Sequence, residues 1–362
     1  MPKPVLVNIH IPYCIRREKY IHSAGLCGTN EEKNAYLEAV MRELKTWEGE
    51  LEGCEVRAVR LCGGSATVMS PDLLGKTLAT ARRVFPMARG AEVSFDANPL
   101  TICTPALTGI ANGQPNRAEL MVRSFNDDEL KAMNCAFDTQ NIRNALLFFN
   151  RFRLNNVSLT LTYGFPEQTE HSWFVSVTSA VNNAPRHIRI QRAVPEEDVQ
   201  MPDDDTCFRL YENACDILQK AGYTQYSRDG FAVGHGASAC EYLSLGGAEI
   251  IGVGLGAVTC LDGCVSRNTD NLRLYVKNAG DPEKLVAKAA ELTEAESERL
   301  YVSGRLQLTE GVDPALAEQR LGHPLSADAM VRLTRLADAG LVTVENGRYA
   351  PTRRGLFEAE RA

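Results

Sequence analysis

Six apolar strands, separated by loops and helical patterns, recur through the first half of the chain, and this repeat limits the possible folds more than any other feature. The strands are predicted over residues 5–11, 56–62, 92–95, 118–122, 156–163 and 187–191. Strands that alternate with helices in this way favour βαβ units and a parallel sheet. Right-handed crossovers would curl such a sheet into a full or partial barrel. The sequence therefore predicts an α/β fold, and periodicity alone leaves a barrel and an open sheet as alternatives.

Local signals place several of the helices. Apolar residues at helical spacing predict an amphipathic helix over 31–48, with Asn30 as its cap. Pro71 can open the helix after the second strand, because proline fits the first helical turn. Another helix is expected over 139–151, capped by Asp138.

Beyond the sixth strand the pattern changes. A helix is expected over 206–221 and an apolar, glycine-interrupted strand over 248–256. Near the end, helical patterns are followed by two alternating runs around Asn346 and Gly347, a strong hairpin signal. Helices followed by a hairpin are typical of a winged helix. We expect three parts: a partial barrel over 1–195, an α/β extension over 196–285 and a helical domain with a β-wing over 286–362.

The composition is that of an ordinary globular protein, with 44% hydrophobic and 23% charged residues among 362. No apolar run approaches the length of a membrane span. The net charge of −7 argues against nucleic acid as a partner, so the winged segment is expected to be a packing module. The first strand begins without a preceding signal peptide, so we expect a cytoplasmic protein. The eleven cysteines are then expected to be reduced thiols or metal ligands.

The loop after the first strand carries the most distinctive motif. Pro12 ends the strand, and Cys14 follows at the carboxyl edge of the predicted sheet, where α/β proteins bind ligands. Together with His10, Tyr13 and Tyr20, these residues follow the pattern His-Ile-Pro-Phe-Cys-x-x-x-Cys-x-Tyr-Cys. The segment resembles the signature of radical-SAM enzymes in the oxygen-independent coproporphyrinogen oxidase and heme chaperone family. The resemblance implies a partial (βα)6 TIM-like barrel, S-adenosyl-L-methionine as cofactor, and porphyrin or heme chemistry.

Two of the three cysteines in that pattern are replaced. In the family, three thiolates hold a [4Fe–4S] cluster, whose fourth iron binds S-adenosylmethionine. Here Cys14 is the sole matching ligand, and Glu18 and Ile21 occupy the other two positions. Glutamate is a hard oxygen donor and isoleucine cannot ligate, so this loop is a poor cage for the cluster. We therefore expect the cluster to be absent or defective.

The other strand-end loops also resemble the family, and the resemblance implies a cofactor site there. Glycines after the second strand would let the backbone approach the cofactor closely. Thr160 stands where the family has an aspartate on the fifth strand. The cofactor-binding residues implied are Tyr13, Tyr20, Gly63, Gly64, Ser65, Asp96, Asn98, Arg123, Ser124 and Gly164.

Two functions stay open. The chain is either a cluster-free relative that binds a tetrapyrrole or another partner, or an active radical-SAM oxidoreductase of the coproporphyrinogen dehydrogenase type. The second function needs a cluster held by rearranged ligands such as Cys27 or Cys62. His235 is either an axial heme ligand or an exposed loop histidine. The residues leave open whether the chain is an enzyme, its catalytic groups, its substrate and its oligomeric state.

Overall fold

The computed structural model describes residues 2–21 and 25–359. Its main feature is a sheet of twelve strands in the order β12-β11-β10-β9-β1-β2-β3-β4-β5-β6-β8-β7. The predicted strands form β1 to β6 and pair in parallel with their neighbours in sequence. They are β1 (Lys3–Ile11), β2 (Cys54–Gly63), β3 (Met87–Ala97), β4 (Arg117–Arg123), β5 (Val157–Tyr163) and β6 (His187–Arg192). The α/β fold with a parallel core is therefore confirmed.

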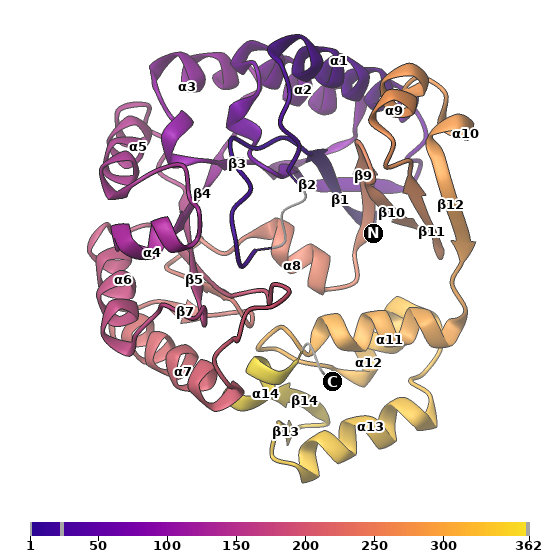
Figure 1. Cartoon of the computed structure of the whole chain (residues 1–362). Coiled ribbons are helices and arrows are strands. Elements are labelled where there is room, and N and C mark those ends of the chain that lie inside the picture. The colour runs from indigo at the N-terminus through magenta and orange to yellow at the C-terminus, as the bar shows by residue number, and fades with distance from the viewer. Residues whose placement is uncertain (1, 22–24, 360–362) are drawn as a thin grey trace.

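Helices cover the outside of these strands in an arc, as Figure 1 shows. The order of the described strands ends at β12 and β7, so the sheet is an open, partial barrel. The outward side chains of the strands pack on the helices; Phe95 of β3, for example, contacts Phe149. The outer helices are α1 (Asn30–Thr46), α2 (Pro71–Val84), α3 (Thr104–Ala111), α4 (Asp127–Ala132), α5 (Thr139–Arg151), α6 (Glu170–Asn182) and α7 (Asp204–Lys220).

The helix starts follow capping chemistry. Asp138 caps α5 and Pro71 is the first residue of α2, as predicted. The cap of α1 was predicted one residue too late. The side chain of Thr29 accepts the Glu32 amide, and the Glu32 carboxylate accepts the Thr29 amide. This reciprocal capping box makes Asn30 the first helical residue.

The middle of the chain extends both edges of the barrel sheet. β9 (Glu249–Val253) pairs in parallel with β1, and three antiparallel strands follow it. β9 lies within the strand predicted over 248–256, but sequence patterns did not predict the three antiparallel strands or the pair on the other edge. The remaining elements here are β7 (Thr224–Gln225), β8 (Gly230–Ala232), α8 (Ala239–Leu245), β10 (Val258–Leu261), β11 (Cys264–Asn268), α9 (Leu272–Asn278), α10 (Pro282–Leu285) and β12 (Val286–Glu291).

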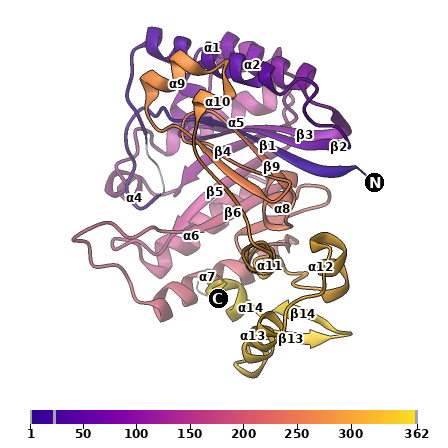
Figure 2. The same cartoon turned by 90° about the vertical axis from the view of Figure 1, so that its right-hand side faces the viewer.

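The C-terminal segment has a core of its own, which includes Tyr301, Val312 and Leu333. It lies on one side of the barrel in Figure 2. The predicted hairpin is present: β13 pairs with β14, and Asn346 and Gly347 both have the positive φ of a type I′ turn. The elements are α11 (Glu294–Arg305), α12 (Pro314–Leu321), α13 (Ala327–Asp338), β13 (Val342–Glu345), β14 (Arg348–Pro351) and α14 (Arg353–Glu358). None of the described helices is both long and apolar enough to cross a membrane.

Candidate functional site

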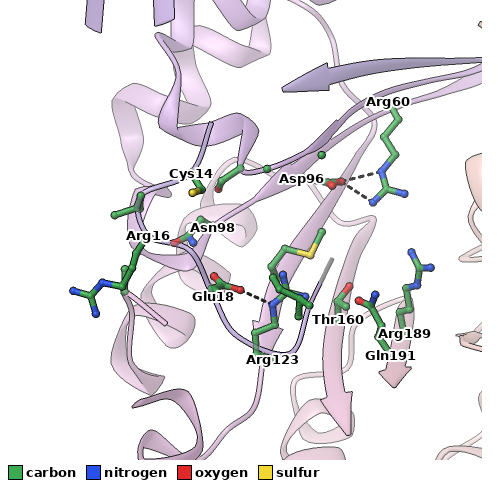
Figure 3. A pocket seen from close by; sticks show the side chains of 17 residues that line it. Cys14, Arg16, Glu18, Arg60, Asp96, Asn98, Arg123, Thr160, Arg189 and Gln191 are labelled. Carbon is green, nitrogen blue, oxygen red and sulfur yellow. Dashed lines mark hydrogen bonds and ion pairs between the residues drawn. The ribbon is translucent and has the colours of Figure 1, made fainter. Parts of the chain in front are cut away.

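A cavity of about 160 Å³ lies at the carboxyl ends of the barrel strands. Its walls come from the loop after β1 and from β2 to β6 (Figure 3). Seven residues that the resemblance implied as ligands of the cofactor or the cluster meet here, although they are up to 109 positions apart in the chain (14 to 123). They are Cys14, Gly63, Gly64, Ser65, Asp96, Asn98 and Arg123.

Backbone hydrogen bonds join the loops after β1 and β2. The Gly64 amide donates to the Ile11 carbonyl at 2.6 Å, and the Ser65 amide donates to the Tyr13 carbonyl at 2.8 Å. A Cβ atom on Gly64 would lie 2.3 Å from that Tyr13 oxygen, and one on Gly63 would lie 2.2 Å from the His10 ring. The motif glycines therefore allow one loop of this chain to approach another, whatever they do toward a ligand.

An ion pair spans the mouth of the cavity at the position of a motif cysteine. The Arg123 Nε donates to the Glu18 carboxylate at 2.8 Å, and both side chains are only 9% exposed. Arg123 adopts a φ of +65°, a strained conformation for a residue with a side chain. Because this carboxylate already has a buried cationic partner, Glu18 acts as a structural group in the loop.

The residues present do not fit a [4Fe–4S] cluster. Three thiolates are needed, and this cavity offers the Cys14 thiol, the ion-paired Glu18 and the aliphatic Ile21. Burial raises the pKa of Cys14, which disfavours the thiolate that iron requires. No three His, Cys, Asp or Glu side chains in the described ranges are grouped so that they could hold a metal ion.

The two alternative cysteines lie in different places. Cys27 is the neighbour of Cys14, because Tyr13 and Leu26 form a parallel β-bridge and the Cys14 amide donates to the Leu26 carbonyl at 3.1 Å. The nearby Cys27 thiol also raises the pKa of Cys14, after the larger effect of burial. Cys62 lies at the end of β2, where burial raises its pKa to about 12. Cys14 and Cys27 therefore lie close together, but of the three cysteines only Cys14 lines the cavity.

Four of the predicted cofactor residues do not line the cavity. The Tyr13 ring packs on Tyr36 with centroids 5.6 Å apart, and the Tyr20 ring stacks on Phe165 at 5.8 Å. The two others make hydrogen bonds within their loops: the Ser124 hydroxyl donates to Glu129, and the Gly164 amide donates to Gln168 at 2.7 Å. These contacts hold the strand-end loops in shape.

The histidines of the motif and of the later loop also differ in environment. His10 is mostly buried, and its Nδ1 donates to the Leu255 carbonyl at 2.7 Å. Burial lowers the pKa of His10, so the ring is a neutral, satisfied structural group. His235 lies in the turn between β8 and α8 and is exposed.

The sequence analysis missed a polar network inside the barrel. Arg60 of β2 donates to Asp96 at 2.9 Å and to Glu119 of β4 at 3.0 Å. Burial raises the pKa of Asp96 to about 6 against the opposing charge of Arg60. Burial also disfavours ionised Glu119, but Arg60 and Arg117 outweigh it and lower that pKa. Figure 3 shows the pair of Arg60 and Asp96 on the side of the cavity opposite Glu18.

A signal for this network is present in the sequence. Single charged residues stand between apolar neighbours in the strands, as in Val59-Arg60-Leu61 and Ile188-Arg189-Ile190. Successive side chains of a strand point to opposite faces, so a lone charge in such a run indicates a polar interior face. Arg189 and Gln191 of β6 line the cavity by this alternation.

The open parallel barrel with a cavity at its strand ends has the fold of a solved radical-SAM enzyme. It superposes on coproporphyrinogen III oxidase (HemN) from Escherichia coli, described as a radical-SAM enzyme, with a TM-score of 0.83. The match covers 99% of this chain and 89% of that one at 19% identity. The HemN C-terminal domain model matches residues 304–357.

Sequence comparison gives the nearer group. The heme chaperone HemW of Escherichia coli is 26% identical over 283 residues, which cover 74% of this chain and 73% of HemW. HemW of Lactococcus lactis is 23% identical over 296 residues, which cover 79% of this chain and 77% of that HemW. An oxygen-independent coproporphyrinogen III oxidase of Cereibacter sphaeroides is 23% identical over 63% of this chain and 53% of its own length. The predicted resemblance to the coproporphyrinogen oxidase and heme chaperone family is thus confirmed: the chain is a homologue of proteins named HemW and coproporphyrinogen III oxidase.

Proposed function

We propose that this chain is a cluster-free relative of HemW that binds a tetrapyrrole or another partner and does not cleave S-adenosylmethionine. The observation that carries the proposal is the ion pair of Glu18 with Arg123, which occupies a cluster-ligand position in the motif. Reductive cleavage of the sulfonium needs an electron from the cluster, and protein side chains do not replace that chemistry.

Iron and sulfide analysis after anaerobic reconstitution tests the proposal. The natural chain should take up no more iron than its Cys14→Ser variant, because Cys14 alone does not hold the cluster. A variant with Glu18→Cys and Ile21→Cys should bind about four irons per chain, because it restores three thiolates on a loop of unchanged length. About four irons and four sulfides on the natural chain would contradict the proposal.

A tetrapyrrole partner is supported by the name of the HemW relatives and by the accessible imidazole of His235. Hemin added to the protein should give a shifted Soret band, and His235→Ala should change that band because the axial ligand sets the electronic state of the iron. His171→Ala is the matched control, since His171 is also exposed. An unchanged spectrum in His235→Ala removes this residue from the heme site.

We also propose roles for the cavity residues and a division of the chain. The small molecule that enters the cavity is bound by the backbone and polar groups of Gly63, Gly64, Ser65, Asp96, Asn98 and Arg123. Without coordination to iron, S-adenosylmethionine keeps only such contacts, so calorimetry should find weak binding.

The proposed parts of the chain are the barrel over 1–195, the extension over 196–285 and the C-terminal domain over 286–362.

A second candidate is a radical-SAM oxidoreductase with rearranged cluster ligands, and the closeness of Cys14 and Cys27 favours it. In that case Cys27→Ser should abolish iron uptake by the natural chain. Iron uptake that is absent, or equal in both proteins, rejects this candidate.

A further inference from the structure

The inner faces of β5 and β6 carry hydrogen-bond donors that nothing in the described chain accepts. Thr160 Oγ1, Thr162 Oγ1 and the Nε of Arg189 are buried and have no hydrogen-bond partner among the described residues. In the parallel register, Thr160 stands beside Arg189, and Thr162 stands beside Gln191. The unused donors therefore form one patch, and Thr160, Arg189 and Gln191 all border the cavity (Figure 3).

The carboxylates around Arg189 are engaged elsewhere. Arg60 binds Asp96 and Glu119, and the Tyr226 hydroxyl donates to Glu241 at 2.8 Å. Arg189 forms one long ion pair, with Asp229 at 3.7 Å from its Nη2, and Asp229 accepts a shorter bond of 2.9 Å from Arg228. The side chain of Arg189 is 26% exposed, and that exposure faces the barrel interior.

Two guanidinium groups divide the interior into two chambers. Arg60 and Arg189 border the cavity at the strand ends and also a second one of about 140 Å³. The second cavity lies farther from the carboxyl ends of the strands, against Asn8 of β1 and Ser244 of α8. Both volumes are well below the roughly 300–1,000 Å³ of sites for drug-sized ligands, so the interior suits a small molecule and is too small for a tetrapyrrole.

Buried donors without partners are rare in folded proteins, and in native structures they indicate a missing acceptor such as a bound ion or water. A guanidinium is planar and offers parallel N–H groups that match the two oxygens of a carboxylate or phosphate. We propose that the barrel interior binds a small oxyanion, a carboxylate or phosphate group on a compact molecule, with Arg189 as its main partner. The hydroxyl of Thr160, which borders the same cavity, donates to the same group. This site is independent of the tetrapyrrole proposal.

Calorimetry at constant ionic strength tests the site with three probes: succinate, inorganic phosphate and uncharged succinamide. Succinate or phosphate should bind with one ion per chain, and the stronger of the two identifies the natural head group. Succinamide has nearly the same shape as succinate but no charge, so it should not bind. The proposal would be overturned if succinamide bound as well as succinate, or if neither anion bound at millimolar concentration. Water would then be the group that accepts hydrogen bonds from Thr160 and Arg189.

Variants then locate the bound ion. Arg189→Gln should weaken the binding of the anion at least tenfold, and Arg143→Gln on the exposed face of α5 should not change it. Thr160→Val keeps the shape of the side chain and removes only the hydroxyl, so it should weaken binding several-fold without affecting folding. If Arg189→Gln fails to fold, the affinity of Thr160→Val for the anion tests the proposal by itself. Unchanged affinity in Thr160→Val and in folded Arg189→Gln would place the anion elsewhere and overturn the proposal.

Discussion

Two buried polar clusters on neighbouring parts of the same sheet differ in how completely their groups are paired. Between α1 and β9, the Glu43 carboxylate accepts the Gly254 amide at 2.9 Å, the Asn268 amide at 2.6 Å and the Tyr275 hydroxyl. Inside the barrel, by contrast, Thr160 lacks a partner among the described residues. A fully paired cluster holds chain segments together, whereas an incompletely paired one is shaped for something that the chain does not supply.

The Glu43 cluster explains why these distant segments keep their geometry. Tyr36 donates to the His10 carbonyl at 2.6 Å and accepts the Leu255 amide at 3.0 Å, so the cluster ties β1 to the turn after β9. A Cβ atom on Gly254 would lie 2.7 Å from both the His10 carbonyl and the Tyr36 hydroxyl. The tight turn and its glycine are therefore requirements of packing.

The largest expected effect is on stability when Glu43 is removed. Glu43→Ala leaves three buried donors without an acceptor and should lower the free energy of unfolding by about 2–4 kcal/mol. Glu38→Ala, on the exposed face of the same helix, should change it by less than about 0.5 kcal/mol. Urea unfolding measures both. Equal losses of unfolding free energy in the two variants would show that the hydrogen bonds of Glu43 do not contribute to stability.

The same cluster should give stability a distinct pH dependence. Burial raises the pKa of Glu43 from 4.5 to about 7, so between these values the folded state binds more protons than the unfolded state. The stabilising contribution of protonated Glu43 is complete below about pH 4.5 and is lost as the pH rises through 7, by up to about 3 kcal/mol. Urea midpoints at pH 5 and pH 7.5 should therefore differ less in Glu43→Gln than in the natural chain. An identical pH dependence would contradict the raised pKa.

The ion pair of Glu18 with Arg123 resembles the Glu43 cluster, because its buried charges are paired within the chain. Glu18→Gln leaves the Arg123 charge buried and should cost about 1–3 kcal/mol of unfolding free energy. Replacing both residues by methionine should recover most of that loss, because no buried charge then remains. Together with the single variants Glu18→Met and Arg123→Met, the double variant completes a cycle, and urea unfolding of its members gives the coupling between the two side chains. Purely additive losses would mean that the two side chains do not interact.

The smallest effects should have opposite signs in the two clusters. Tyr275→Phe removes one donor from Glu43 and should lower stability by about 1–2 kcal/mol. Thr160→Val removes a buried hydroxyl without a partner, so it should leave stability unchanged or raise it by up to about 1 kcal/mol. Thermal unfolding without added anions compares the two. A loss in Thr160→Val as large as that in Tyr275→Phe would erase the distinction between the clusters.

The sequence predicted those parts of the molecule that depend on local signals. The strands of the barrel, the helix α5 with its Asp138 cap, and the hairpin at Asn346 and Gly347 were all identified because periodicity, capping and turn chemistry act over a few residues. The short exposed strand β12 was missed, because it carries no apolar alternation that would mark a buried face.

The site was predicted only in part, for a physical reason. The loops were placed at one edge of the sheet, so the meeting of Cys14 with Asp96 and Arg123 followed from the parallel topology. The ion pair of Glu18 with Arg123 joins residues 105 positions apart. It also depends on the left-handed backbone conformation of Arg123, which no local sequence pattern predicts. Motif glycines were assigned to a ligand alone, although their contacts with β1 require them in any case.

The loop after β1 is closed at its base. The Leu26 amide donates to the Pro12 carbonyl at 2.7 Å, and the Cys14 amide returns a bond to Leu26, so both ends of the loop are fastened to each other before it rejoins the barrel. These two bonds set where the chain leaves β1 and where it returns, whereas Glu18 and Tyr20 within the loop add their own contacts with Arg123 and Phe165. The bonds that fasten the loop come from backbone groups, so side-chain substitutions within the loop leave its points of attachment in place.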